Sequence, residues 1–227
     1  MAALTLITIA PRSRLAQPAV AAPPAVEGIL LKQSTGVGMG GAITLKYVPH
    51  VLFADGSITS DLRDMATTSA DFAAWRARDP SRWGTARLSG ETVEVRWPDG
   101  KTDRWAKMYR ARPADASLQL DGRYRDLGGT GNTALGGSQL VAVWTDYTFG
   151  PGAAFERGGG AGATASSGGG SVVTSSTAPG ARGTYVTDRW TISFTDDRGV
   201  TQRTWFYRFP DSDRTIGIGM GTYLKRR

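Results

Sequence analysis

Residues 84–109 read GTARLSGETVEVRWPDGKTDRWAKMY, and residues 183–207 read GTYVTDRWTISFTDDRGVTQRTWFY. The two stretches align without a gap over their first 17 residues, so that Gly100 falls on Gly199. Matching segments also precede them, because Phe53 and Phe149 occupy equivalent places. The spacing of 96 to 99 residues is too long for a solenoid, whose repeats run about 20–50 residues, and it indicates two tandem homologous units.

Within each stretch the side chains alternate as they do in a β-strand with one buried face. Val93 and Val95 alternate with polar residues, and residues 98–100 (PDG) then form a turn, since proline presets one backbone angle and glycine tolerates a positive φ. The second copy repeats this hairpin pattern, and residues 118–120 and 216–218 predict one further strand in each unit. The predicted fold class is all-β, with two antiparallel β-meander or small-barrel units of about five or six strands each.

The two units differ in one insertion. In the first unit, residues 60–83 predict a short helix, which Ser69 can cap and Pro80 ends, with Phe72 and Trp75 on one face.

In the second unit, the same place holds residues 157–182, a tract of Gly, Ser, Thr and Ala. Such a composition buries little apolar surface, so this tract is expected to be a mobile loop. We therefore divide the chain into a signal-like or disordered N-terminal segment (residues 1–27), a first unit (28–127) and a second unit (128–227).

The N-terminal segment resembles an export signal. Residues 2–10 (AALTLITIA) are apolar and have the length of a signal-peptide core, but they are too few to cross a bilayer, which takes about 20 residues. Residues 19–22 (AVAA) form a small-x-small cleavage pattern, although no basic residue precedes the apolar run. We expect a periplasmic or secreted protein without a transmembrane segment, and the alternative is a flexible tail rich in Ala and Pro.

Composition excludes several kinds of chemistry. The chain has no Cys and one His, so it has no disulfide framework, cysteine nucleophile, zinc ribbon or multi-histidine metal site. The net charge of +7 comes from 22 Arg and 5 Lys, which alternate with Asp along the chain. Because nucleic-acid binders gather their charge on one face, this pattern does not favour nucleic acid. No metal or cofactor is predicted.

Three motifs that could carry chemistry have simpler interpretations. Residues 36–41 (GVGMGG) fit the dinucleotide pattern, but a strand is expected to follow them where that pattern needs a helix. His50 stands alone beside a proline, with no nucleophile motif to serve, and it is interpreted as a structural or surface residue. Asp55 and Asp61 flank a turn and are the carboxylates that a hydrolase would use, although they do not form a convincing acid–base pair.

Aromatic residues are the best candidates for a binding site. The chain has seven Trp, seven Tyr and seven Phe, and in a small barrel they either fill the interior or line a cup for a ligand. Trp75 and Trp83 are expected to face the mouth of such a cup. The predicted ligand-binding residues are Trp75, Trp83, Trp105, Tyr109, Trp205 and Tyr207.

The run from Gly183 through Gly199 to Tyr207, with its weaker copy at residues 84–109, resembles the β-meander domains of uncharacterised bacterial envelope proteins, some of them similar to small lipocalin-like barrels. The resemblance covers most of residues 40–227, rests on turn and strand patterns, and implies no catalytic residues.

Three functional hypotheses follow. The leading one is a non-enzymatic exported binding protein whose aromatic-lined β interior holds a small apolar ligand or glycan. The alternative is a protein–protein interaction module (an inhibitor, an immunity protein or an envelope assembly factor) that docks through an exposed helix at Phe72 and Trp75. The third is a carboxylate-dependent hydrolase that uses Asp55 or Asp61.

Overall fold

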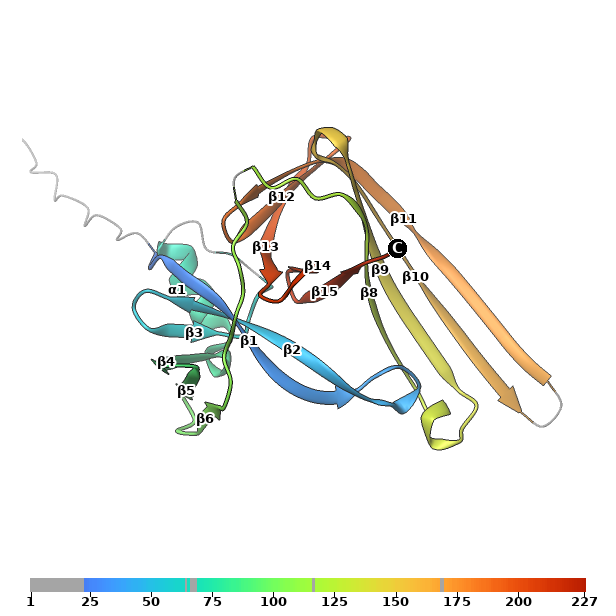
Figure 1. Cartoon of the computed structure of the whole chain (residues 1–227), viewed down its shortest axis with the longest axis horizontal. Coiled ribbons are helices and arrows are strands. Elements are labelled where there is room, and N and C mark those ends of the chain that lie inside the picture. The colour runs from blue at the N-terminus through green and yellow to red at the C-terminus, as the bar shows by residue number, and fades with distance from the viewer. Residues whose placement is uncertain (1–22, 64, 66–68, 116, 168–169) are drawn as a thin grey trace, which may run out of the picture.

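The computed structural model describes residues 23–63, 65, 69–115, 117–167 and 170–227, which form two antiparallel β-sheets and one α-helix (Figure 1). The first sheet is open, and the second closes into a barrel. In both sheets consecutive strands are neighbours, as in a meander, except that β7 pairs with β1 at the edge opposite β6. The all-β class and the two-unit organisation predicted from the sequence are confirmed, whereas the origin of the units by duplication stays a prediction.

The open sheet has the strand order β6-β5-β4-β3-β2-β1-β7. Its long hairpin of β1 and β2 projects beyond the other strands (Figure 1). The elements of this part of the chain are β1 (Val26–Val37), η1 (Met39–Gly41), β2 (Ile43–Phe53), β3 (Ser57–Thr59), α1 (Ser69–Arg78), η2 (Pro80–Arg82), β4 (Trp83–Ser89), β5 (Thr92–Arg96), β6 (Thr102–Trp105) and β7 (Tyr109–Arg110).

The barrel follows the order β10-β11-β12-β13-β14-β15-β8-β9 and closes between β9 and β10. Strands β8 to β11 run past the rest of the barrel wall as a long extension (Figure 1). The elements are β8 (Gly122–Gly131), η3 (Thr133–Leu135), β9 (Leu140–Gly150), η4 (Pro151–Ala153), β10 (Ala154–Ser167), β11 (Gly170–Asp188), β12 (Thr191–Asp196), β13 (Thr201–Phe209), β14 (Ser212–Ile218) and β15 (Gly221–Lys225).

The glycine-rich tract at residues 157–182 is not the loop that its composition predicts. It forms most of β10 and β11, and only residues 168–169 lie outside the described part of the chain. β10 pairs with β9 from Ala154 to Thr164 and with β11 out to Ser167. Main-chain hydrogen bonds that continue the barrel's ladders hold this hairpin, so it needs little apolar burial of its own.

The helical insertion is confirmed as α1, and the turn glycines Gly100 and Gly199 have the expected positive φ of 82° and 80°. The predicted strand at Leu118–Leu120 is wrong, although its counterpart at Ile216–Ile218 lies in β14. The backbone of Leu120 instead bonds to the Tyr185 hydroxyl, which accepts from its N–H at 2.6 Å and donates to its carbonyl at 3.3 Å. A side chain thus replaces the strand ladder there.

The two sheets divide between Arg110, where β7 ends, and Gly122, where β8 begins. The predicted boundary after residue 127 therefore falls inside a barrel strand, and the boundary after residue 27 falls inside β1. The connecting segment docks on the barrel, because Arg112 and Arg208 exchange backbone hydrogen bonds of 2.9 Å in both directions. The Arg112 guanidinium extends this contact to the Phe209 carbonyl at 3.0 Å.

Buried apolar side chains form three clusters, one inside the barrel and one on each face of the open sheet. Residues 29–31 show how the faces are assigned, because Ile29 and Leu31 point toward the barrel while Leu30 points away from it. The cluster between the open sheet and the barrel, here called the inter-sheet core, also receives Phe72 from α1 and Trp205 from the outer face of β13.

Candidate functional site

The six predicted ligand-binding residues do not meet in one cup. Four of them lie in the inter-sheet core and are at most 4% exposed: Trp75, Trp83, Trp205 and Tyr207. Trp105 is buried on the opposite face of the open sheet, and Tyr109 is half-buried at the edge of the inter-sheet core. The expectation that Trp75 and Trp83 face a mouth is wrong, because they pack against each other with ring centres 4.8 Å apart.

The barrel interior is filled by other aromatic side chains. Tyr147 stacks on Phe149 and Phe194 with ring centres 5.8 and 5.1 Å apart, and Phe155 lies 4.8 Å from Phe194. Ring centres at 4.5–7 Å are typical of packed aromatic pairs. The interior therefore has the packing of a core, which was the alternative to a ligand cup.

The helix α1 does not expose the side chains expected to bind a partner. Phe72 and Trp75 are only 9% and 4% exposed, and both rings pack against Phe53 of β2 at 5.1 and 6.1 Å. The i,i+3 spacing had indicated one apolar face correctly. That face turns inward, because the helix closes the end of the inter-sheet core.

Asp61 is a buried structural anion. Its carboxylate is fully buried and accepts hydrogen bonds from Arg63 Nε at 2.6 Å and from Arg78 at 3.3 Å, which ties the segment after β3 to the end of α1. The Arg63 hydrogen bonds hold the pKa of this carboxyl well below its usual range. Asp55 accepts hydrogen bonds from the backbone and hydroxyl of Ser57, as a turn residue does. The two carboxylates thus hold turns in place.

His50 is buried against Trp105, with ring centres 4.8 Å apart, and its Nδ1 lies 3.0 Å from the Val48 carbonyl oxygen. Burial lowers the pKa of the imidazole to about 4. Lys32 and Asp103, which pair with each other nearby, act on it in opposite directions. A neutral imidazole enclosed in this way is a structural residue, in agreement with the interpretation from the sequence.

The glycine motif at residues 36–41 forms the turn between β1 and β2. The strand expected after it begins at Ile43, and the helix that a dinucleotide site requires does not follow. Gly40 and Gly41 have φ of 73° and 87°, and a Cβ on Gly41 would lie 3.0 Å from the Gly131 carbonyl oxygen. Glycine is needed here for the turn and for its close approach to β8.

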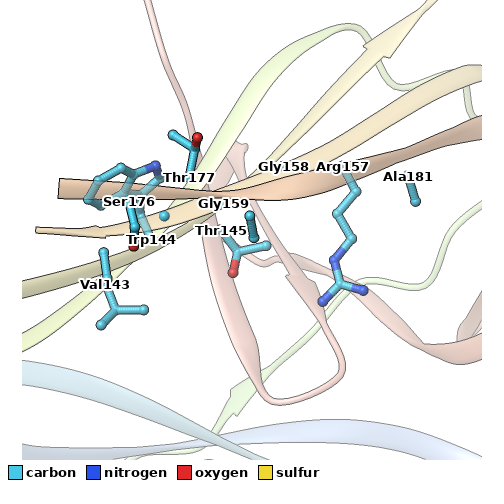
Figure 2. A pocket seen from close by; sticks show the side chains of 12 residues that line it. Val143, Trp144, Thr145, Arg157, Gly158, Gly159, Ser176, Thr177 and Ala181 are labelled. Carbon is cyan, nitrogen blue, oxygen red and sulfur yellow. The ribbon is translucent and has the colours of Figure 1, made fainter.

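An open cleft lies on the extension of the barrel wall, over β9, β10 and β11, with a volume of about 560 Å³. Figure 2 shows Trp144, Ser176 and Thr177 toward one end and Arg157 toward the other, with Thr145 between them. Arg157 carries the only charge among the lining side chains, since the remaining lining residues are Gly, Ala and Val.

Glycines make the floor of this cleft. Gly160 pairs across the strands with Trp144, and a Cβ on Gly160 would overlap the indole ring and lie 2.6 Å from the Ser176 carbonyl oxygen. A Cβ on Gly159 would lie 2.8 Å from the carbonyl oxygen of Trp144. The bare backbone of β10 therefore leaves room for the indole, which lies on the face of β9 and β10 opposite Arg157 and Thr145, since side chains alternate along the paired strands.

The two arginines near the cleft differ in their partners. Arg125 lies 5.7 Å from the centre of the Trp144 ring and binds both oxygens of Asp146, at 2.7 and 2.8 Å. This hydrogen bonding lowers the pKa of Asp146 to about 2, so the pair stays charged and fixes one side of the indole. Arg157 lies over the Tyr147 ring at 5.7 Å, and no carboxylate of the described residues forms an ion pair with it. Its charge is available to a ligand.

Sequence reasoning missed Arg157 and the contact of Trp144 with Gly160, because it assigned residues 157–182 to a loop. A signal was present in the β-branched residues Val172, Val173 and Thr174, which favour a strand.

A second groove separates the β1–β2 hairpin from β8 and β15, with a volume of about 580 Å³. Aliphatic side chains are prominent in it, including Val37, Leu45, Leu127 and Leu224, which are 49–64% exposed.

No known protein family, curated protein or solved structure matches this chain. Among the residues that the structure describes, no helix has the length and apolar character required to cross a bilayer. In the same part of the chain, no group of three His, Asp or Glu side chains gathers as a metal site would require.

Proposed function

We propose that this protein is a non-enzymatic, exported binding protein and that its ligand is an acidic glycan held in the cleft over β9–β11. The observation that carries the proposal is Arg157, whose charge has no carboxylate partner among the described residues, on the same face of the open cleft as the hydroxyl groups of Thr145 and Ser176.

The lining matches the chemistry of a sugar acid. A pyranose ring presents hydroxyls at its rim, which exchange hydrogen bonds with Thr145 and Ser176 on the Arg157 face of the cleft. A guanidinium binds a carboxylate through two parallel hydrogen bonds. A purely apolar ligand would leave Arg157 and the hydroxyls unpaired, so a glycan fits better than the other predicted ligand class.

The burial of the candidate catalytic residues supports a binding protein rather than an enzyme. Asp61 and His50, which were the candidates for catalysis, are buried and hold local structure. Export remains part of the proposal and rests on the signal-like pattern of the N-terminal segment, most of which lies outside the described residues. The resemblance to duplicated, lipocalin-like envelope domains agrees with such a location.

The test is isothermal titration of the purified protein with oligogalacturonate and with neutral cello-oligosaccharides of equal length. We expect the acidic oligomer to bind more tightly. Arg157→Gln should weaken oligogalacturonate binding about 10-fold or more, since a hydrogen bond to a charged group contributes about 1.5–3 kcal/mol. Arg87→Gln removes the same charge from an exposed site on β4 and should change nothing.

Failure of both oligosaccharides to bind would refute the glycan assignment. Binding that survives in Arg157→Gln as well as in Arg87→Gln would place the ligand elsewhere. The aromatic barrel interior, predicted from the sequence, would then be the next region to test. The alternative of a partner-binding helix requires Phe72 and Trp75 to leave the inter-sheet core, which their burial does not favour.

A further inference from the structure

One strand edge of the barrel extension is free over a long stretch. β11 pairs with β12 only from Gly183 to Asp188, and among the described residues no strand lies along the outer side of residues 170–181. Figure 1 shows β11 as the outermost strand of the extension. Residues 171–178 are exposed, and Val172 and Val173, which point to opposite faces, are 64% and 72% exposed.

Pro179 and a register shift against β10 interrupt this edge where it meets the barrel, but residues 170–178 lack the features by which proteins protect free strands. Soluble proteins place charged residues, prolines or bulges on open edges, since unpaired N–H and C=O groups recruit other strands. Three other segments that lack a partner on one side have such a residue: Lys32 in β1, Lys46 and Pro49 in β2, and Asp126 in β8.

Residues 170–178 (GSVVTSSTA) contain neither a charge nor a proline, and no charged residue occurs from residue 158 to residue 181. In a chain of net charge +7, two copies that meet along this segment bring no like charges opposite each other.

We infer that residues 170–178 are a strand-addition edge and that its occupant is the same segment of a second copy of this chain, paired antiparallel about a two-fold axis. Such an interface is isologous, with the same patch contributed by both molecules. A partner strand that carries charges would find no opposite charge on this segment. A second copy of the segment carries no charge and therefore needs none. The main-chain hydrogen bonds of an added strand supply the affinity.

Full overlap of this segment with its copy fixes the register. Thr174 lies opposite Thr174 of the second molecule, Val173 lies opposite Ser175, and Val172 lies opposite Ser176. β-branched and hydroxyl side chains thus meet across the interface, where such pairs stabilise a sheet. Each barrel extension continues into the other as one sheet. The inference concerns assembly and does not depend on the glycan proposal.

The first test is the mass in solution, by light scattering over a range of micromolar concentrations. We expect twice the chain mass of 24.1 kDa. Thr174→Lys should dissociate the dimer, since it places two like charges directly opposite each other. The control is Ala163→Lys, on the same face one strand inward, where the residue pairs with both β9 and β11. In the dimer, the new ammonium groups of the two molecules would lie about 14 Å apart across the two-fold axis. Salt would largely screen their repulsion.

The second test measures the register and uses the absence of Cys from the chain. Mild oxidation should link two Thr174→Cys molecules, but not two Ser175→Cys molecules, whose thiols lie on a diagonal about 7–8 Å apart. Val173→Cys mixed with Ser175→Cys should give the mixed disulfide. A monomeric wild-type protein at every concentration would overturn the inference, as would equal effects of the two Lys variants or equal cross-linking of Thr174→Cys and Ser175→Cys.

Discussion

The indole ring of Trp144 occupies the space in which a Cβ on Gly160 would stand. The two residues are cross-strand partners of β9 and β10, so the ring lies over the bare backbone of the neighbouring strand. The glycines of β10 are thus a packing requirement of the indole ring, which a side chain at residue 160 would displace.

Gly160→Ala should displace the indole of Trp144 and narrow the cleft. The new methyl group would overlap the ring and lie 2.6 Å from the Ser176 carbonyl oxygen, so we expect a loss of about 1–3 kcal/mol in the free energy of unfolding. Urea unfolding followed by tryptophan fluorescence measures both effects. Gly158→Ala is the matched control, because a Cβ there has no neighbour within 4 Å. Equal stability of the two variants would contradict the role of Gly160.

Gly217→Ala should destabilise the contact between the barrel and the inter-sheet core. Gly217 pairs with Tyr207 across β13 and β14, and its Cβ would overlap the fully buried tyrosine ring. The ring cannot move away without opening the core, so we expect a loss of about 1–3 kcal/mol in the free energy of unfolding. Gly128→Ala, in an open position on β8, should be neutral or slightly stabilising. Thermal and urea unfolding of the two variants provide the comparison.

Stability should fall as the pH decreases from 6.5 toward 4, because of His50. The folded protein lowers the pKa of this group from 6.5 to about 4 by burial, so in that window the unfolded chain binds a proton that the folded protein does not. The contribution of the neutral His50 to stability is fully present above pH 6.5. The loss in the free energy of unfolding approaches about 3 kcal/mol at pH 4. His50 is the only histidine, so His50→Gln should flatten this part of the stability–pH curve. A slope unchanged in that variant would contradict the assignment.

Asp61→Asn should weaken the contact between the segment after β3 and the end of α1. It removes the charge that Arg63 and Arg78 bind, and since both arginines are about half exposed, we expect a loss of only about 1–3 kcal/mol in the free energy of unfolding. Because the pKa of Asp61 is lowered, this stability is present above pH 4 and disappears as the pH falls further. Chemical unfolding at pH 7 and at pH 3 tests both statements.

The control for Asp61 is Asp99→Asn, which breaks the exposed pair of Asp99 with Lys101. Exposed pairs of this kind contribute little, so no measurable change is expected. If the two Asn variants lose the same stability at pH 7, the anchoring role of Asp61 is wrong.

Local patterns in the sequence correctly predicted the elements that depend on near neighbours. The alternation at Val93 and Val95, the turns at Gly100 and Gly199 and the single helix ending before Pro80 are all present. Each rests on a few adjacent residues, because strand alternation, positive-φ turns and proline stops are local effects.

Side-chain placement was less predictable. Trp205 and Phe206 are adjacent, and strand alternation requires that one face outward and the other inward. Nothing local decides which of them faces the barrel interior. The structure puts Phe206 inside and Trp205 in the inter-sheet core, because the open sheet docks on the outer face of β13. The predicted ligand cup was therefore assigned to residues that belong to different clusters.

The sequence by itself determined the all-β class, the two units, the hairpin turns and the exclusion of cysteine and multi-histidine chemistry. Only the tertiary structure decided that residues 157–182 are strands, that one unit closes into a barrel and that Arg157, Thr145 and Ser176 share a cleft. Barrel closure joins β8 to β15 and β9 to β10, and the partners of these ladders supply the hydrogen bonds that a glycine-rich segment cannot gain alone. Such pairings join residues far apart in the chain, so no local pattern records them.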